Sequence, residues 1–277
     1  MEPKLILVEG LPGSGVTTIT NKMKKELEEE GNQVVVYRET STHPTDMTRQ
    51  AYITKEEYHE FVADCLTEWI DSKQTISDEE LIRRIEMQCQ WEDDSVFIAY
   101  RNIDFPEGSY EKIMDKLEKK RIFGGKCSFE TFKMLHLRRW ERFAKAMQVR
   151  KEVAIFESAY LKNQLLELFC YHEKDEEEIL DYMMELIHTV DFLNPHMIYV
   201  MTDDVEASLR KAVRGREKKR RYKDWYDVLE EAVQNSRYAK ERHLSGVSGM
   251  VQLLKEKQRL DYMVLERIGI LVSWVSN

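Results

Sequence analysis

A glycine-rich stretch near the N-terminus carries the strongest chemical signal in the sequence. It reads Gly10-Leu11-Pro12-Gly13-Ser14-Gly15-Val16-Thr17. This matches the phosphate-loop pattern G-x-x-x-x-G-K-S/T at every defining position except the lysine, where Val16 stands. The glycines of such a loop let the backbone curl, so that successive N–H groups point at phosphate oxygens. The start of the following helix adds a partial positive charge. We therefore predict a phosphate-binding loop; a glycine-rich turn that binds no ligand is the alternative.

The threonines that follow the loop have their own expected role. The hydroxyl of Thr17 would ligate a magnesium ion, with Thr18 as its neighbour. The residues that we expect to bind the nucleotide are Gly10, Pro12, Gly13, Ser14, Gly15, Val16, Thr17 and Thr18.

Val16 removes the positive charge that this loop normally carries. A lysine at this position contacts the β- and γ-phosphates and neutralises charge as the phosphoryl group moves. Because valine has no charge and no donor, we expect nucleotide binding and catalysis to lose at least ~1.5–3 kcal/mol. Three possibilities stay open: another cation replaces the lysine, the chain has kept the fold without catalysis, or the valine is an introduced substitution.

Two carboxylates follow apolar stretches that are typical of buried strands. Glu157 follows the stretch 152–156, and Glu39 follows the stretch 33–38. Parallel sheets bind ligands at the carboxyl ends of their strands, so we take both side chains as candidates for the site. A solvated glutamate at a strand end is the alternative for each of them.

A basic segment lies in the C-terminal half of the chain. Residues 210–221 include 8 lysines and arginines out of 12. Arg210 and Arg214 are four residues apart and would share one helix face. A basic lid that closes over phosphates explains this cluster in an acidic protein. A solvated charge run and a nucleic-acid surface are the two alternatives.

Hydrophobic patterning indicates the elements that would position these residues. Five short apolar runs predict buried strands, and helical segments separate them. The runs are 4–9, 33–38, 152–156, 196–201 and 268–275. The first two, with a helix at about 17–30 between them, predict a βαβ unit. The whole pattern predicts a parallel sheet covered by helices on both faces.

The segment 41–126 has a different pattern. We predict helices at about 55–71, 78–90 and 109–120, and a strand pair near 95–104. We interpret this segment as a mainly helical insertion, or acceptor-binding subregion, within a single domain that spans residues 1–277.

Composition narrows the class of protein. The 277 residues include 42 Lys+Arg and 51 Asp+Glu, a net charge of −9, which argues against nucleic acid as the main partner. The four cysteines form no C-x-x-C pair, as expected for free thiols in a reducing compartment. Because no apolar run approaches the ~18 residues that span a bilayer and no signal peptide is evident, we expect a cytoplasmic protein without membrane contact.

Taken in order along the chain, several features resemble the P-loop small-molecule kinases, in particular the nucleoside and nucleotide kinases of the thymidylate-kinase type. The phosphate loop is specific to the superfamily, and the other segments support the likeness mainly by their order. The similar segments are the opening with GLPGSG and VTT, Phe156-Glu157-Ser158, Asn194-Pro195-His196-Met197-Ile198-Tyr199-Val200, and the lid Ser208–Arg216. The likeness covers about 4–40, 129–216 and 266–275, and it leaves out 41–126.

The resemblance implies a fold and an activity. The fold would be a three-layer α/β/α P-loop NTPase fold whose five parallel strands, numbered along the chain, lie in the order 2-3-1-4-5. The activity would be a kinase reaction, with ATP and Mg²⁺, on a small hydroxyl- or phosphate-bearing metabolite. Glu157 would orient or deprotonate the acceptor hydroxyl, or support magnesium through water. Glu39 is a candidate to contact the substrate because of its position at the end of a strand on the same edge, not because of the resemblance. The other implied site residues are Arg210, Arg214 and Arg216 for charge stabilisation, and Arg139 and Arg142 for the acceptor.

Two other functions stay open. The chain could be a non-catalytic nucleotide- or phosphate-binding module that acts through a partner, which Val16 favours and the lid arginines and Glu157 oppose. It could also be an NTP hydrolase. A nucleotide and a small-molecule acceptor are the expected partners, and a homodimer is left open.

Overall fold

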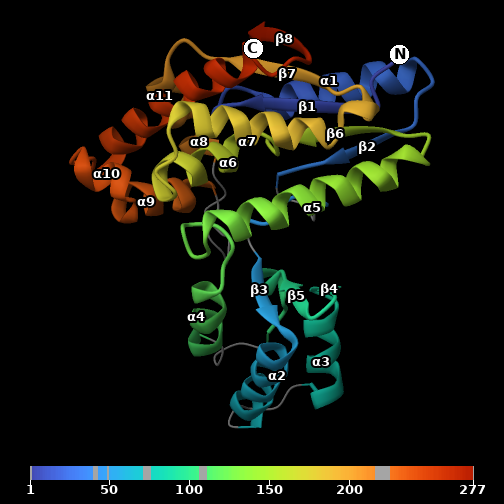
Figure 1. The fold of residues 1–277 in the computed structure, drawn as a ribbon, viewed down its shortest axis with the longest axis vertical. Helices are drawn as coiled ribbons and strands as arrows, with labels where there is room; N and C mark the ends of the chain where they lie inside the picture. Colours follow the sequence, from blue (N-terminus) through green and yellow to red (C-terminus); the bar gives the residue numbers. More distant parts are fainter. Residues whose placement is uncertain are drawn as a thin grey trace. The chain divides into compact units, whose positions relative to one another are not determined.

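The computed structural model describes residues 2–39, 43–48, 50–70, 76–105, 111–215 and 225–276 (Figure 1). The chain divides into two compact units. The first consists of Met1–Asp46 and Lys133–Asn277, and the second, Met47–Phe132, interrupts it along the sequence. None of the helices in the described ranges has the length and apolarity needed to cross a membrane.

A five-stranded, all-parallel sheet forms the centre of the first unit. Its strand order is β2-β6-β1-β7-β8, which is the predicted order 2-3-1-4-5. The strands are β1 (Leu5–Gly10), β2 (Val34–Tyr37), β6 (Val153–Glu157), β7 (His196–Met201) and β8 (Leu271–Ser276). Every residue of β1 and β6 is buried, because strands covered on both faces need apolar side chains throughout. The predicted fold class is confirmed.

Helices cover both faces of this sheet (Figure 1). On one face, α1 (Val16–Glu29) packs Ile19, Met23 and Leu27 against a cluster of strand side chains. On the other face, Phe156 contacts the rings of Trp140 and Phe143 from α5 (Phe129–Gln148). Tyr199 on this face contacts Tyr262 of α11 (Gly246–Leu265).

Shorter helices complete the first unit. They are α6 (Lys162–Leu166), which continues into the π-helix Glu167–Tyr171, α7 (Glu176–His188), α8 (Val205–Gly215), α9 (Trp225–Asn235) and α10 (Arg237–Glu241). Helix α7 begins with a capping box, in which the Asp175 side chain accepts from the Glu178 N–H and Glu178 accepts from the Asp175 N–H. This local signal fixes where the helix starts.

The second unit combines helices with a small antiparallel sheet in the order β3-β5-β4. Its elements are β3 (Ala51–Thr54), α2 (Lys55–Ile70), α3 (Asp78–Glu86), β4 (Cys89–Glu92), β5 (Ser95–Ile98), a 3₁₀ turn at Tyr100–Asn102, and α4 (Glu111–Lys119). The three helices agree with the prediction. The prediction of a strand pair near 95–104 is wrong in its extent. Strand β5 pairs antiparallel with β4, which precedes it in the sequence, and the turn between them includes Asp93, whose φ is 42°.

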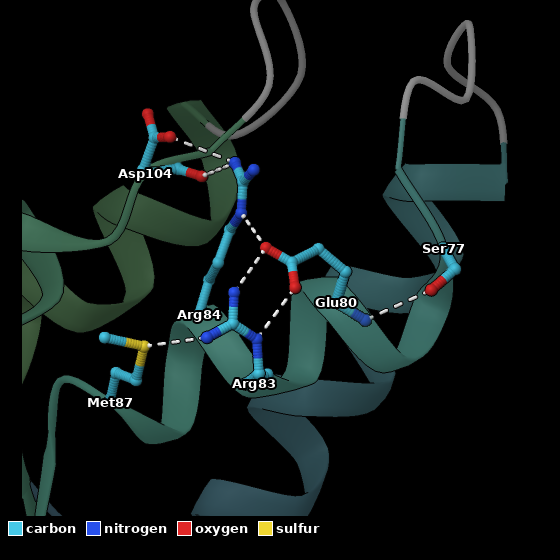
Figure 2. Close-up of polar contacts among 6 residues, drawn as sticks. All are labelled: Ser77, Glu80, Arg83, Arg84, Met87 and Asp104. Carbon is cyan, nitrogen blue, oxygen red and sulfur yellow. Dashed lines mark hydrogen bonds and ion pairs between the residues drawn. The ribbon is translucent and has the colours of Figure 1, made fainter.

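A network of hydrogen bonds and ion pairs lies on the surface of α3 in the second unit (Figure 2). Ser77 caps the helix by accepting from the Glu80 N–H at 3.3 Å. The Glu80 carboxylate accepts from Arg83 at 2.8 Å and from Arg84 at 2.9 Å. Arg84 also donates to the Asp104 carboxylate at 3.0 Å, so it joins α3 to the segment before residue 105. These two guanidinium groups lower the pKa of Glu80 to about 2.

Candidate functional site

The predicted phosphate loop connects the end of β1 to the start of α1. The Ser14 N–H donates to the Leu11 carbonyl at 3.1 Å, which closes the turn. Helix α1 then begins at Val16, immediately after Gly15. The first N–H groups of a helix have no acceptor within it, and such a terminus favours an anion. The backbone here therefore has the form that phosphate binding requires.

Helix α8 packs directly on this loop. The Ser208 hydroxyl donates to the Pro12 carbonyl at 2.8 Å. Gly13 has a φ of +85°, and a Cβ atom placed there would lie 2.1 Å from the Ser208 carbonyl oxygen. Only glycine fits this approach of two backbones. The predicted lid helix is thus anchored to the loop at its first turns.

The end of β6 brings a carboxylate to the first turn of α1. In the sheet, Glu157 pairs in register with Val8. The alternation of side chains along β6 turns Glu157 to the α1 face, on which Val153 and Ile155 also lie. There the Thr17 hydroxyl donates a hydrogen bond to Glu157 Oε1.

A cation completes this contact. Arg38 Nη1 donates to Glu157 Oε2 at 3.2 Å, and Arg38 Nη2 donates to Asn21 Oδ1 at 2.6 Å. The structure therefore joins two predicted site residues, Thr17 and Glu157, and adds Arg38.

Val16 is part of the hydrophobic core. Its side chain is only 8% exposed, and it packs in the cluster between α1 and the sheet, with Val8 and Val200 among its members. The valine is therefore well accommodated as an apolar residue at the position where the motif has its lysine.

A second acid–base pair lies at the end of β2. Glu39 forms an ion pair with Lys162 of α6 at 2.7 Å, and the Lys162 side chain is almost fully buried. Glu39 was predicted from the sequence, whereas Arg38 and Lys162 were not. The position of Arg38 at the carboxyl end of a strand was the available signal; Lys162 had none, because its partner is distant in sequence.

The predicted acceptor residues on α5 have different environments. Arg139 is buried, and its Nη1 donates to the Asp46 carbonyl at 3.4 Å. Arg142 is exposed. Near Asp46, the His43 ring is buried against Phe156 with 4.2 Å between ring centroids. Burial lowers the pKa of His43 to about 4, so this histidine is neutral near pH 7.

The predicted lid arginines lie on α8, beyond its contact with the loop. Arg210 forms an ion pair with Glu206 of the same helix, and both side chains are well exposed. Arg210 is two residues from Ser208, about 200° around the helix. Ser208 therefore faces the loop, and Arg210 turns away from it. Arg214 is also exposed. Arg216 lies outside the described residues.

A buried polar network lies directly before the loop, on the opposite face of the sheet. Glu9 pairs in register with Tyr199, and its Oε1 accepts from the Tyr160 N–H at 2.6 Å. Burial raises the pKa of Glu9 to about 7. Close by, Lys257 Nζ binds both oxygens of Asp261 at 2.7 and 2.9 Å, and the Tyr199 hydroxyl donates to the same carboxylate at 2.7 Å.

The fold and the loop together define a P-loop NTPase-like protein. The family model for chromatin associated protein KTI12 matches residues 3–79, which include the loop. This match supports the P-loop superfamily. A comparison with curated proteins finds no match to the chain.

Proposed function

We propose that the protein binds a nucleoside triphosphate, ATP in the first instance, and transfers its terminal phosphoryl group to a small hydroxyl- or phosphate-bearing metabolite. The observation that carries this proposal is the hydrogen bond between Thr17 and Glu157 at the mouth of the loop. It puts a hydroxyl and a carboxylate next to the backbone N–H groups that would hold phosphates, which is the arrangement that phosphoryl transfer uses.

The metal site would be built by these same residues. Magnesium is usually held by one or two carboxylates together with phosphate oxygens and water, rather than by a full set of protein ligands. Within the described ranges no group of three or more His, Cys, Asp and Glu is placed to hold a metal. Thr17 and Glu157 fit the sparser arrangement, and bound Mg²⁺ would supply neutralisation of phosphate charge.

The other predicted site residues have proposed roles toward the acceptor and the phosphates. Glu157 would also orient the acceptor, with Glu39 beside it at the carboxyl edge of the sheet. Arg139 and Arg142 would contact the acceptor from α5. Arg210, Arg214 and Arg216 would stabilise charge on the phosphates, and Arg210 would first have to leave its ion pair with Glu206.

A second candidate is a P-loop module that binds a nucleotide without catalysis and acts through a partner. The packing of Val16 in the core favours it, because the loop has no lysine to reach the transferring group. The words "chromatin associated" in the name of the matching family favour a partner of that setting, and a nuclear rather than a cytoplasmic location. NTP hydrolysis is a third candidate, which no specific contact favours.

Calorimetric titration with Mg·ATP, for the wild type and for Val16→Lys, tests the proposal. We expect saturable binding by the wild type and tighter binding by Val16→Lys. If neither form binds, the phosphate loop holds no nucleotide and the kinase proposal fails. If both bind, a screen of hydroxyl and phosphate acceptors with radiolabelled ATP separates the candidates: label transferred to an acceptor supports a kinase, release of inorganic phosphate alone supports a hydrolase, and neither supports the non-catalytic module.

A further inference from the structure

The Arg38 guanidinium lies beside the two residues that mark the proposed phosphate site. It donates to Glu157 at 3.2 Å, and the other oxygen of that carboxylate accepts from the Thr17 hydroxyl. One carboxylate therefore separates the Arg38 charge from the first turn of α1. The Asn21 side chain, one helical turn further along α1, fixes the other end of the guanidinium at 2.6 Å.

The physical properties of Arg38 suit the charge that the loop lacks. Its side chain is 37% exposed, so it is accessible to a ligand from solvent. A guanidinium is always protonated and has five N–H donors in a planar fork that matches a phosphate group. It can bind a phosphate oxygen while it keeps its partner on Glu157.

Other cations around the carboxyl edge are engaged elsewhere. Lys162 is buried in its ion pair with Glu39. Arg139 is buried and donates to the Asp46 carbonyl, and Arg210 pairs with Glu206 on the far side of α8. Arg38, in contrast, contacts Glu157, and Glu157 itself accepts from Thr17 in the first turn after the loop.

We propose that Arg38 is a phosphate ligand that supplies, from the end of β2, the positive charge that Val16 removes from the loop. This inference rests on the proposed function, and its ligand is the terminal phosphate of a nucleoside triphosphate. Arg38 replaces the lysine from another strand, which explains how a loop with a buried valine keeps a cation for its substrate.

Calorimetric titration of Arg38→Gln with Mg·ATP, Mg·ADP and AMP tests this role. Loss of a charge-assisted contact should weaken Mg·ATP binding about 10- to 100-fold, Mg·ADP less, and AMP hardly at all. Arg38→Lys, which keeps the charge without the planar fork, should fall between wild type and Arg38→Gln. Lys25→Gln is the matched control, since it removes one charge from the exposed side of α1, where Lys25 pairs with Glu29 at 3.6 Å.

A double-mutant cycle separates a phosphate ligand from a residue that merely positions Glu157. If the two cations serve the same phosphate, Arg38→Gln should weaken Mg·ATP binding much less in the Val16→Lys background than in the wild type. If Arg38 only positions Glu157, Arg38→Gln should cost the same affinity in both backgrounds. Thermal melting confirms that each variant folds. If the wild type binds Mg·ATP and Arg38→Gln binds it equally well, or if Arg38→Gln costs the same affinity in both backgrounds, the role of Arg38 is overturned while the proposed function stands. If the wild type binds no triphosphate, the role of Arg38 fails, and if Val16→Lys does not bind one either, the proposed function fails with it.

Discussion

The Thr17 hydroxyl donates a hydrogen bond to the Glu157 carboxylate, although the two residues are 140 positions apart in the sequence. The strand order produces this contact. Strand β6 lies beside β1 and pairs Glu157 with Val8. Glu157 is therefore placed next to the end of β1, where the loop begins. Two residues that were predicted separately from the sequence thus meet at one point of the carboxyl edge.

The hydroxyl of Thr17 should determine how strongly binding depends on metal. In Thr17→Val the shape is kept and the hydroxyl is lost, so Mg·ATP affinity should fall about tenfold or more, the usual cost of a hydrogen bond to a charged group. Affinity for ATP measured without metal should change much less. Thr17→Ser keeps the hydroxyl and should behave like the wild type. Equal losses with and without Mg²⁺ would contradict a role in metal binding.

Any side chain at Gly13 should destabilise the fold, because it would clash with a neighbouring backbone. A second glycine with a similar φ serves as the control for this steric effect. Gly13 and Gly31 both have positive φ, at +85° and +90°, but a Cβ meets the Ser208 carbonyl only at Gly13. Gly31→Ala should cost about 1 kcal/mol of backbone strain. Gly13→Ala should cost about 1–3 kcal/mol more, because α8 must move off the loop. Urea unfolding measures both; equal effects would show that α8 does not press on the loop.

Removing one partner of the buried pair Lys257–Asp261 should lower the free energy of unfolding more than replacing both partners with apolar residues. Its side chains are 1% and 0% exposed. Lys257→Met leaves the buried carboxylate without a counter-charge, with only the Tyr199 hydroxyl still donating to it among the bonds described above, and should lower the free energy of unfolding by about 3–5 kcal/mol. The double variant Lys257→Met/Asp261→Leu should recover part of that loss, because it removes the buried charge but leaves the Tyr199 hydroxyl without its acceptor.

The exposed pair Lys24–Glu28, at 3.3 Å, provides the control for this effect. Lys24→Met should change the unfolding free energy by less than about 1 kcal/mol. If Lys257→Met were as mild as Lys24→Met, the buried pair would have no special role in stability.

Titration of Glu9 should contribute to the change of the free energy of unfolding with pH. Burial raises its pKa from 4.5 to about 7 in the folded protein. Its stabilising contribution is therefore complete below pH 4.5, where the carboxyl is protonated in both states, and is lost as pH rises through 7. Between about pH 5 and 8 the wild type should lose up to about 3 kcal/mol more stability than Glu9→Gln.

Comparison with Glu9→Gln removes the effect of the buried histidines. Burial lowers the pKa of His43 to about 4 and that of His136 to about 3, so both destabilise the fold as pH falls below 6.5, in wild type and variant alike. Chemical unfolding at a series of pH values gives the difference curve. A flat curve would mean that Glu9 titrates normally in the folded protein.

The central sheet could be predicted from the sequence because its strands are buried on both faces. Runs such as that of β1 are buried at every position, and short apolar runs between helical segments are typical of strands in a covered parallel sheet. The glycine spacing likewise indicated the phosphate loop. The small sheet of the second unit was harder, since β4 reads Cys-Gln-Trp-Glu and is only partly buried, so its polar residues give no clear period.

The contacts that complete the site depend on tertiary structure. Arg38 and Glu157 are 119 residues apart, and nothing in either segment indicates which strand-end cation meets which carboxylate. Similarly, Val16 could be recognised as a missing lysine, but its membership of the core between α1 and the sheet required the packed structure. For the lid arginines, helix periodicity predicted that Arg210 and Arg214 share one face of a helix. It did not predict whether that face is turned toward the loop or away from it.

Hydrogen exchange resolved to single amides, with and without Mg·ATP, tests the central claim most directly. If the loop cradles phosphates, exchange of the backbone N–H groups from Gly13 to Thr18 should slow on addition of Mg·ATP, and Thr17→Val should weaken that protection. Unchanged exchange across Gly13–Thr18, or protection confined to other parts of the chain, would contradict the assignment of this loop as the phosphate site.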